Sequence, residues 1–229
     1  MHKSTLRISL TLGTVAGTVL AVLSAAYALV LAIGILTSPS RGAQIQNPWF
    51  TLMEILILII VPTMIGFSVG IHSWTRKDRK AVALLGVAFM SMCGVVTSCV
   101  HFAILTLSRQ QAFAAGGFAT RVFSFEWPSI AYALDILAWD FFFPLGACCT
   151  ALAIDGGGKV KFARALMFGS GLIAMIGMLG VPMANMNVRN IGIIGYVFLF
   201  PVATGLLASV LRQQPTTIDA QFSSNRTLE

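Results

Sequence analysis

Six long apolar stretches, separated by short polar segments, dominate the pattern along this chain of 229 residues. A helix needs about 20 apolar residues to cross the hydrocarbon core of a bilayer, which is about 30 Å thick. Each stretch meets that length and is predicted to form one membrane-spanning helix: residues 8–36, 50–73, 81–107, 129–154, 163–185 and 190–211. The pattern therefore predicts an all-α polytopic membrane protein with one six-helix bundle over residues 1–211.

Both ends of the chain need a separate interpretation. Basic residues before the first stretch and Ser24-Ala25-Ala26 within it resemble a secretory signal, but the apolar core of such a signal is only about 7–15 residues long. This stretch continues to Leu36, so we expect a retained first helix. Residues 212–229 are polar and predict a disordered tail. The final Leu228-Glu229 resembles a vector-derived junction and is left out of the fold prediction.

The composition supports the same class of protein. Apolar residues make up 57% of the chain and charged residues only 10%, whereas about a quarter of a soluble domain is charged. So few charges are too sparse to cover a globular surface. The composition therefore excludes a water-soluble enzyme, a disordered chain and a nucleic-acid-binding protein.

The net charge of +7 predicts the orientation, because the basic residues lie almost wholly between the apolar stretches. Short cytoplasmic loops carry the excess of Lys and Arg in membrane proteins. With the N-terminus in the cytoplasm, the inner side holds Lys3, Arg7, Arg76, Lys77, Arg79, Lys80, Lys159, Lys161, Arg164, Arg212 and Arg226, and the outer side only Arg41, Arg109, Arg121 and Arg189. We therefore expect both termini in the cytoplasm, in a bacterial plasma (inner) membrane.

Small residues predict where the helices pack, because close backbone approach contributes to helix association in lipid. Gly13 and Gly17 have the GxxxG spacing, and Ser170/Ala174 and Gly180/Ala184 repeat it in the fifth stretch. We expect these faces to make contacts within one chain rather than in a homodimer. The oligomeric state stays open.

Prolines lie near the middles of three stretches, at Pro62, Pro144 and Pro201. Each removes a backbone donor and frees the carbonyl four residues earlier. We expect kinked helices around a central cavity. Three related helical hairpins are the alternative, although the spacing between the prolines is unequal.

Four ionisable residues fall inside the predicted spans and away from their ends: Glu54, His101, Asp135 and Asp140. Because a charge inside the bilayer costs at least about 2.5–3.5 kcal/mol, such residues face the bundle interior and are candidate functional residues. At a rise of about 1.5 Å per residue, the first three lie about 10 Å outward of the midplane, and we expect them to form one cluster. Asp140 lies almost at the midplane.

Asp140 is the leading candidate, because Pro144 frees its carbonyl beside its carboxyl group. We expect it to be protonated at rest and to exchange a proton or a cation. Five positions separate it from Asp135, about 140° around an α-helix, so the two are not expected to share one small pocket. Trp139 shares the face of Asp135 and joins the predicted site.

Each candidate also has a structural interpretation. Glu54 could pair with Arg109 or Arg41, and His101 could be a neutral core residue bonded to Thr97 or Thr106. Asp135 could pair with His101. A basic side chain against Asp140 would favour a packing role for that residue.

Aromatic residues gather near these candidates. Trp139, Phe141 and Phe143 either line a hydrophobic pocket with cation–π capacity or fill the kink at Pro144. The outer connection, residues 108–128, interleaves polar residues with Phe113, Phe118, Phe123, Phe125 and Trp127. It is predicted to lie in the membrane interface or to fold over the mouth of the bundle.

No catalytic or cofactor motif is found in the sequence. The four cysteines lack a CxxC spacing, the predicted spans carry no lysine for a retinal Schiff base, and HExxH, GxSxG and nucleotide loops are absent. We therefore expect neither a metal nor a cofactor.

Three functions remain open. The leading one is a proton- or cation-coupled transporter that binds a small molecule or cation in an outward-facing polar pocket formed by Asp140, Asp135, Glu54, His101 and Trp139. The second is a membrane-embedded acid–base enzyme, an isomerase or cyclase acting on a lipidic or isoprenoid substrate. The third is a non-catalytic lipid or ligand receptor, or a subunit of a complex. Membrane lipid is the expected partner in each case.

Overall fold

The structure, a computed structural model, describes residues 3–40, 44–107, 110 and 122–226. In this part of the chain the secondary structure is helical throughout, and six helices are long and apolar enough to cross a membrane. These spans are Arg7–Leu36, Trp49–Trp74, Lys77–Thr106, Ile130–Ala153, Lys159–Met178 and Met186–Gln214. The predicted all-α class and the number of apolar helices are confirmed.

Three spans are continuous α-helices and a fourth begins with a short turn. Helices α1 (Lys3–Leu36), α2 (Trp49–Trp74) and α8 (Lys159–Met178) are uninterrupted, and a 3₁₀ turn, η1 (Lys77–Arg79), leads into α3 (Lys80–Thr106).

The other two spans each contain a wider, π-helical turn. The fourth span consists of α6 (Ile130–Ile136), the π-helical η2 (Leu137–Phe142) and α7 (Phe143–Ala153). The sixth consists of α9 (Met186–Ile194), the π-helical η3 (Gly195–Leu199) and α10 (Phe200–Arg226).

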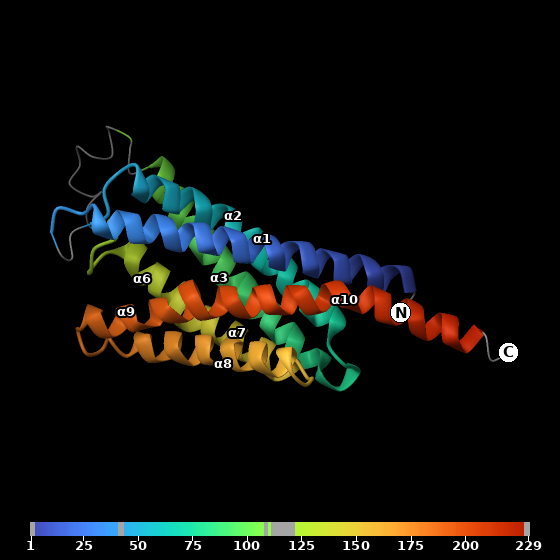
Figure 1. Cartoon of the computed structure of the whole chain (residues 1–229). Coiled ribbons are helices and arrows are strands. Elements are labelled where there is room, and N and C mark those ends of the chain that lie inside the picture. Colours follow the sequence, from blue (N-terminus) through green and yellow to red (C-terminus); the bar gives the residue numbers. More distant parts are fainter. Residues whose placement is uncertain (1–2, 41–43, 108–109, 111–121, 227–229) are drawn as a thin grey trace.

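The helices run alternately up and down in one bundle (Figure 1). Helix α1 packs on α2 and α10, α3 packs between α2 and α7, and α8 packs against α7, α9 and α10. Both chain termini lie at one end of the bundle. The opposite end, which carries residues 37–40, 44–48, 122–129 and 179–185, is called the outer end here after the predicted orientation.

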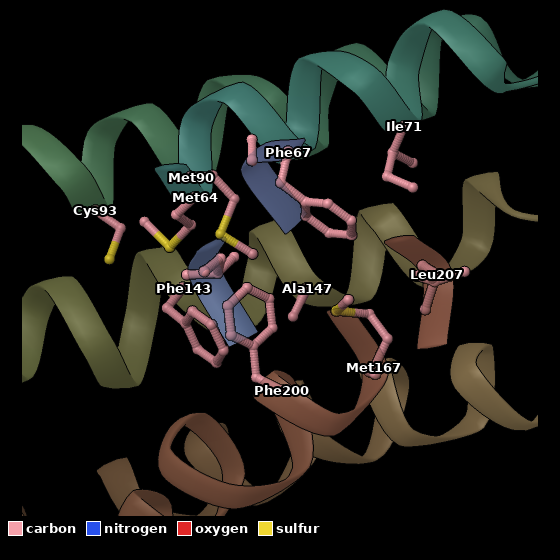
Figure 2. Close-up of a cluster of buried hydrophobic side chains, with 14 of the residues drawn as sticks. Met64, Phe67, Ile71, Met90, Cys93, Phe143, Ala147, Met167, Phe200 and Leu207 are labelled. Carbon is pink, nitrogen blue, oxygen red and sulfur yellow. The ribbon is translucent and has the colours of Figure 1, made fainter. Parts of the chain in front are cut away.

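The core fills the middle of the bundle and its inner half. Figure 2 shows side chains that meet there, among them Phe67 of α2, Met90 of α3, Phe143 of α7, Met167 of α8 and Leu207 of α10. All five are almost completely buried. This apolar core fixes the helices below the polar residues of the outer half.

Glycines let α1 approach its neighbours very closely. A Cβ atom added at Gly13 would lie 2.8 Å from the Cα of Gly70, and one added at Gly17 would lie 2.6 Å from Cδ2 of Phe67. Ser170 likewise donates from its hydroxyl to the carbonyl of Gly195, over 2.9 Å. The expected intramolecular packing of the Gly13/Gly17 and Ser170/Ala174 faces is confirmed.

The boundary between the fifth and sixth spans differs from the predicted one. The fifth span was predicted to reach residue 185, but α8 ends at Met178 and a turn with Pro182 follows. Ala184 has a positive φ of 49°, and the Asn185 side chain caps α9 by accepting from two backbone N–H groups. The sequence did not predict this turn because its residues are mostly apolar. As a result, Arg189 lies inside the sixth span and not in an outer loop.

The C-terminal segment is also different from its prediction. Residues 212–226 continue α10 as a helix, where the polar sequence had predicted disorder. A run of polar residues excludes membrane burial but not helix formation, since Gln213 and Gln214 are good helix formers. The last residues, 227–229, lie outside the described part of the chain.

Two of the three prolines are preceded by the π-helical turns. The N–H of Phe143, just before Pro144, bonds to the carbonyl of Ala138, and that of Phe200, just before Pro201, bonds to that of Gly195. Each bond spans five residues, so the helix accommodates the proline by widening one turn. Pro62 lies within the α-helical α2.

The predicted orientation can be tested by cysteine labelling. In a background without Cys93, Cys99, Cys148 and Cys149, we expect Ser40→Cys to react with an impermeant maleimide in intact cells. Gly157→Cys should react only after the cells are permeabilised, because it lies at the opposite end beside the basic loops. Reaction of position 157 in intact cells would reverse the orientation.

The close approach of α1 and α2 gives a second prediction. Gly70→Ala should destabilise the purified protein by about 1–3 kcal/mol, because the added methyl group collides with the backbone of Gly13. Gly169→Ala is the matched control: it is also a helical glycine, but its nearest neighbour, Cδ1 of Leu199, would be 3.9 Å away. Thermal unfolding in detergent should show a loss only for the first variant.

Candidate functional site

A cavity of about 280 Å³ lies in the outer half of the bundle. Four ionisable residues of the spans, Glu54, His101, Asp135 and Arg189, line it together with apolar and aromatic side chains. All three tyrosines of the chain also line it: Tyr27, Tyr132 and Tyr196. Polar side chains from α1, α2, α3, α6, α9 and η3 therefore line the cavity.

Glu54, His101 and Asp135 form the predicted cluster. The Nδ1 of His101 lies 2.9 Å from Oε2 of Glu54, and its Nε2 lies 3.4 Å from Oδ1 of Asp135. The side chains of His101 and Glu54 are 3% and 2% exposed. Each of the three residues lies five positions from the outer end of its helix, which explains why their depths agree.

Both ring nitrogens of His101 therefore face carboxyl oxygens. A neutral imidazole carries one N–H, so its other nitrogen would meet a carboxylate oxygen with no proton between them. An imidazolium, or a neutral imidazole beside a protonated carboxyl group, avoids this repulsion. The cluster therefore favours an extra proton, held by His101 or by one of its two neighbours.

Arg189 joins this cluster to Asp140. Its Nε lies 2.9 Å from Oδ2 of Asp140, and its Nη2 lies 3.4 Å from Oδ2 of Asp135. Its Nη1 points to the hydroxyl of Tyr132 at 3.5 Å, and its guanidinium carbon lies 5.0 Å from the centre of that ring. Arg189 is 4% exposed. One buried guanidinium thus links Asp135, Asp140 and Tyr132.

Sequence reasoning missed Arg189 because it had placed this residue in an outer loop. Two signals pointed to it. Pro182 and the helix-capping Asn185 mark a helix that begins before Arg189. In addition, ionisable residues inside a membrane commonly pair with one another, so Asp140 pointed to a partner at similar depth.

The two aspartates also share one cation. Both contact Arg189, although five positions were expected to turn them about 140° apart. The π-helical η2 lies between Asp135 and the end of that turn, and its hydrogen bonds join residues five apart. This wider turn, together with the length of the arginine fork, brings both carboxylates to one cation.

Asp140 is fully buried, at 0% exposure, and the residues that line the cavity in the described chain do not include it. Its Oδ1 lies against α9 at Gly192, where an added Cβ would be 2.7 Å away. Its contact with the basic side chain of Arg189 favours a packing role for Asp140. The exchange of a proton or cation by Asp140 stays a prediction.

The three deep aromatic residues occupy different environments. Trp139 lines the cavity, 5.2 Å from Tyr196 between ring centres. Phe143 is fully buried beneath it and packs edge-on against Phe200 at 5.0 Å, so it fills the kink. Phe141 is 39% exposed on the outside of the bundle. Trp139 alone of these three belongs to the cavity wall.

The described end of the outer connection, residues 122–129, folds over the mouth of the bundle. The Phe125 ring stacks on His101 at 5.4 Å, and it contacts Phe50 and Tyr132 edge-on, both at 5.9 Å. Phe123 packs with Phe125 against Val100 and Ile104. This segment closes the cavity above His101. Phe113, Phe118, Arg41, Arg109 and Arg121 lie outside the described residues.

Within the described ranges, no group of three or more His, Cys, Asp or Glu side chains is arranged to hold a metal ion. The four cysteines are free thiols. The chemistry available at the cavity is therefore that of carboxylates, an imidazole, a guanidinium and aromatic rings.

Comparison of the chain with protein-family models, with curated proteins and with solved structures finds no match. The function must therefore be argued from the site itself.

The contact of Arg189 with two aspartates gives a prediction about stability. Arg189→Met should destabilise the protein by roughly 3–5 kcal/mol, because it leaves two buried carboxylates without their cation. Adding Asp140→Asn should restore part of the loss by removing one of them. Arg76→Met is the control: its side chain is 68% exposed and pairs at the surface with Asp78, and such pairs contribute about 0–1 kcal/mol.

Thermal unfolding of the purified variants in one detergent measures all three effects. Equal stability of Arg189→Met and Arg76→Met would show that Arg189 does not hold the helices together.

Proposed function

We propose that the protein is a proton-coupled membrane transporter that binds a small molecule or cation in the outer cavity. The observation that carries this proposal is the placement of His101, whose two ring nitrogens face Glu54 and Asp135 on the cavity wall. The six apolar helices are compatible with a membrane protein.

The cluster has the parts of a proton relay. A proton on His101 lies between two carboxyl groups from different helices, so it can be passed to Glu54 of α2 or to Asp135 of α6. The two acceptors have different surroundings, because Asp135 also contacts the guanidinium of Arg189. A ligand that changes the contacts of Asp135 would therefore change where the proton rests. Such a link between binding and protonation is what proton coupling requires.

The interrupted helices support transport over the two alternatives. Secondary transporters bind their substrates where discontinuous helices meet, and alternating access moves one part of the bundle against another. Here η2 carries Asp140 and Trp139, and η3 carries Tyr196 beside the cavity. In a transporter, such irregular turns are places where the outer part of a span can move relative to its inner part. A bacterial inner membrane, with the cavity facing outward, is the location we propose.

Proton movement in liposomes tests this function. We expect the wild-type protein, with pyranine trapped inside the liposomes, to admit protons when a membrane potential is imposed and a small-molecule extract is supplied outside. His101→Gln should abolish this movement, because glutamine keeps hydrogen bonding but cannot take up and release a proton near neutral pH. His72→Gln is the matched control, since His72 lies near the other end of α2.

Proton entry that is equal in wild type and His101→Gln would overturn the relay. Proton entry no greater than in protein-free liposomes would overturn transport itself.

A further inference from the structure

Three walls of the cavity change from charged to apolar toward the interior of the bundle, and this change indicates what the cavity binds. On α2, Glu54 is followed toward the interior by Ile57 and Ile60, over about 9 Å at 1.5 Å per residue. On the sixth span, Arg189 and Asn190 are followed by Val197 and Phe200.

The fourth span shows the same order, with Asp135 followed by Trp139. In these three walls an apolar, aromatic floor lies beneath the charged groups, while Phe50 and Met53 precede Glu54 on its outer side. A ligand that matches this arrangement has a polar head and an apolar body.

The charged half of the cavity favours a cationic head. Asp135 contacts both His101 and Arg189, and Arg189 is shared with Asp140, so three carboxyl groups face one guanidinium and one imidazole and the cluster can accept a further cation. An anionic head would have to displace one of these carboxylates and would lie beside Glu54. Aromatic faces at the same level, Phe125 and Tyr132, add cation–π capacity.

The size of the cavity limits the apolar part. A volume of about 280 Å³ lies near the lower end of ligand pockets, which span about 300–1,000 Å³. It has room for a single ring or a short chain and not for a diacyl lipid.

We propose that the cavity binds a small amphiphilic amine, with its protonated nitrogen at Asp135 and its apolar body against Ile60, Trp139 and Phe200. This inference rests on the proposed function, because it names the substrate class of the same cavity. It can nevertheless be tested by binding alone.

Three probes with one body and different heads test the head. These are 4-phenylbutylamine, 4-phenylbutanol and 4-phenylbutyrate, added to the purified full chain in detergent, with binding measured from thermal stabilisation and by native mass spectrometry. We expect the amine to bind at least about tenfold more tightly than either of the others. Asp135→Asn should remove this preference and leave the affinity for the alcohol unchanged. Asp78→Asn, which removes an exposed carboxylate in η1, should have no effect.

Two neighbouring isoleucines test the apolar floor. Ile193→Phe fills the cavity from its wall and should weaken the binding of all three probes by about tenfold. Ile194→Phe adds the same ring one residue away, where the side chain is 48% exposed, and should leave binding unchanged. Because Ile193 carries no charge, this pair remains informative if Asp135→Asn fails to fold.

The outcomes separate this inference from the transport proposal. Equal binding of the amine and the alcohol, stronger binding of the carboxylate, or no binding of any probe overturns the amphiphilic amine. Tight amine binding without proton movement in liposomes supports the amine and overturns transport. Proton movement together with preferred binding of the carboxylate supports transport and overturns the amine.

Discussion

The guanidinium of Arg189 is the constraint on which the outer half of this bundle depends. A buried arginine cannot lose its charge, so it must be compensated by anions that the fold brings to it. Here the anions are Asp135 and Asp140, and both come from one span, while Arg189 itself comes from another. The pairing fixes α9 against α6 and η2, and through Asp135 it fixes the position of His101 and Glu54. The whole polar cluster therefore has one arrangement, which apolar packing alone would leave loosely defined in lipid.

Close packing elsewhere makes this arrangement tolerable. Gly192 leaves room for the carboxyl group of Asp140 against α9, and Gly13 and Gly70 bring α1 and α2 together on the other side of the bundle. Below the cavity, Phe143 and Phe200 seal the polar residues from the inner half. The charges are thus confined to one layer, bounded by Phe125 at the mouth and by aromatic rings beneath.

The sequence was sufficient for the class of fold, the number of apolar helices and the cluster of Glu54, His101 and Asp135. Each of these follows from position along a straight helix, which the rise per residue determines. It was insufficient where the helix is not regular. Arg189 was misplaced because the turn before it is built from apolar residues, and the contact of both aspartates with it was not predicted because the wider turn η2 could not be foreseen. Local backbone geometry of this kind depends on neighbours far away in the sequence, such as the Ser170 hydroxyl that bonds the carbonyl of Gly195.

The two π-helical turns have a consequence for how these helices tolerate insertion and deletion. Each turn holds one residue more than an α-helical turn does, so it acts as a built-in insertion that offsets the outer part of its span from the inner part. Loss of one residue within 137–142 would convert the turn to α-helix and rotate everything outward of it by about 100°. Asp135 would then point away from Arg189, while the packing of α7 would keep its phase. One residue in each π-helical turn therefore sets how the outer half of the span is rotated relative to its inner half. That rotation decides the direction in which the polar side chains of the outer half point.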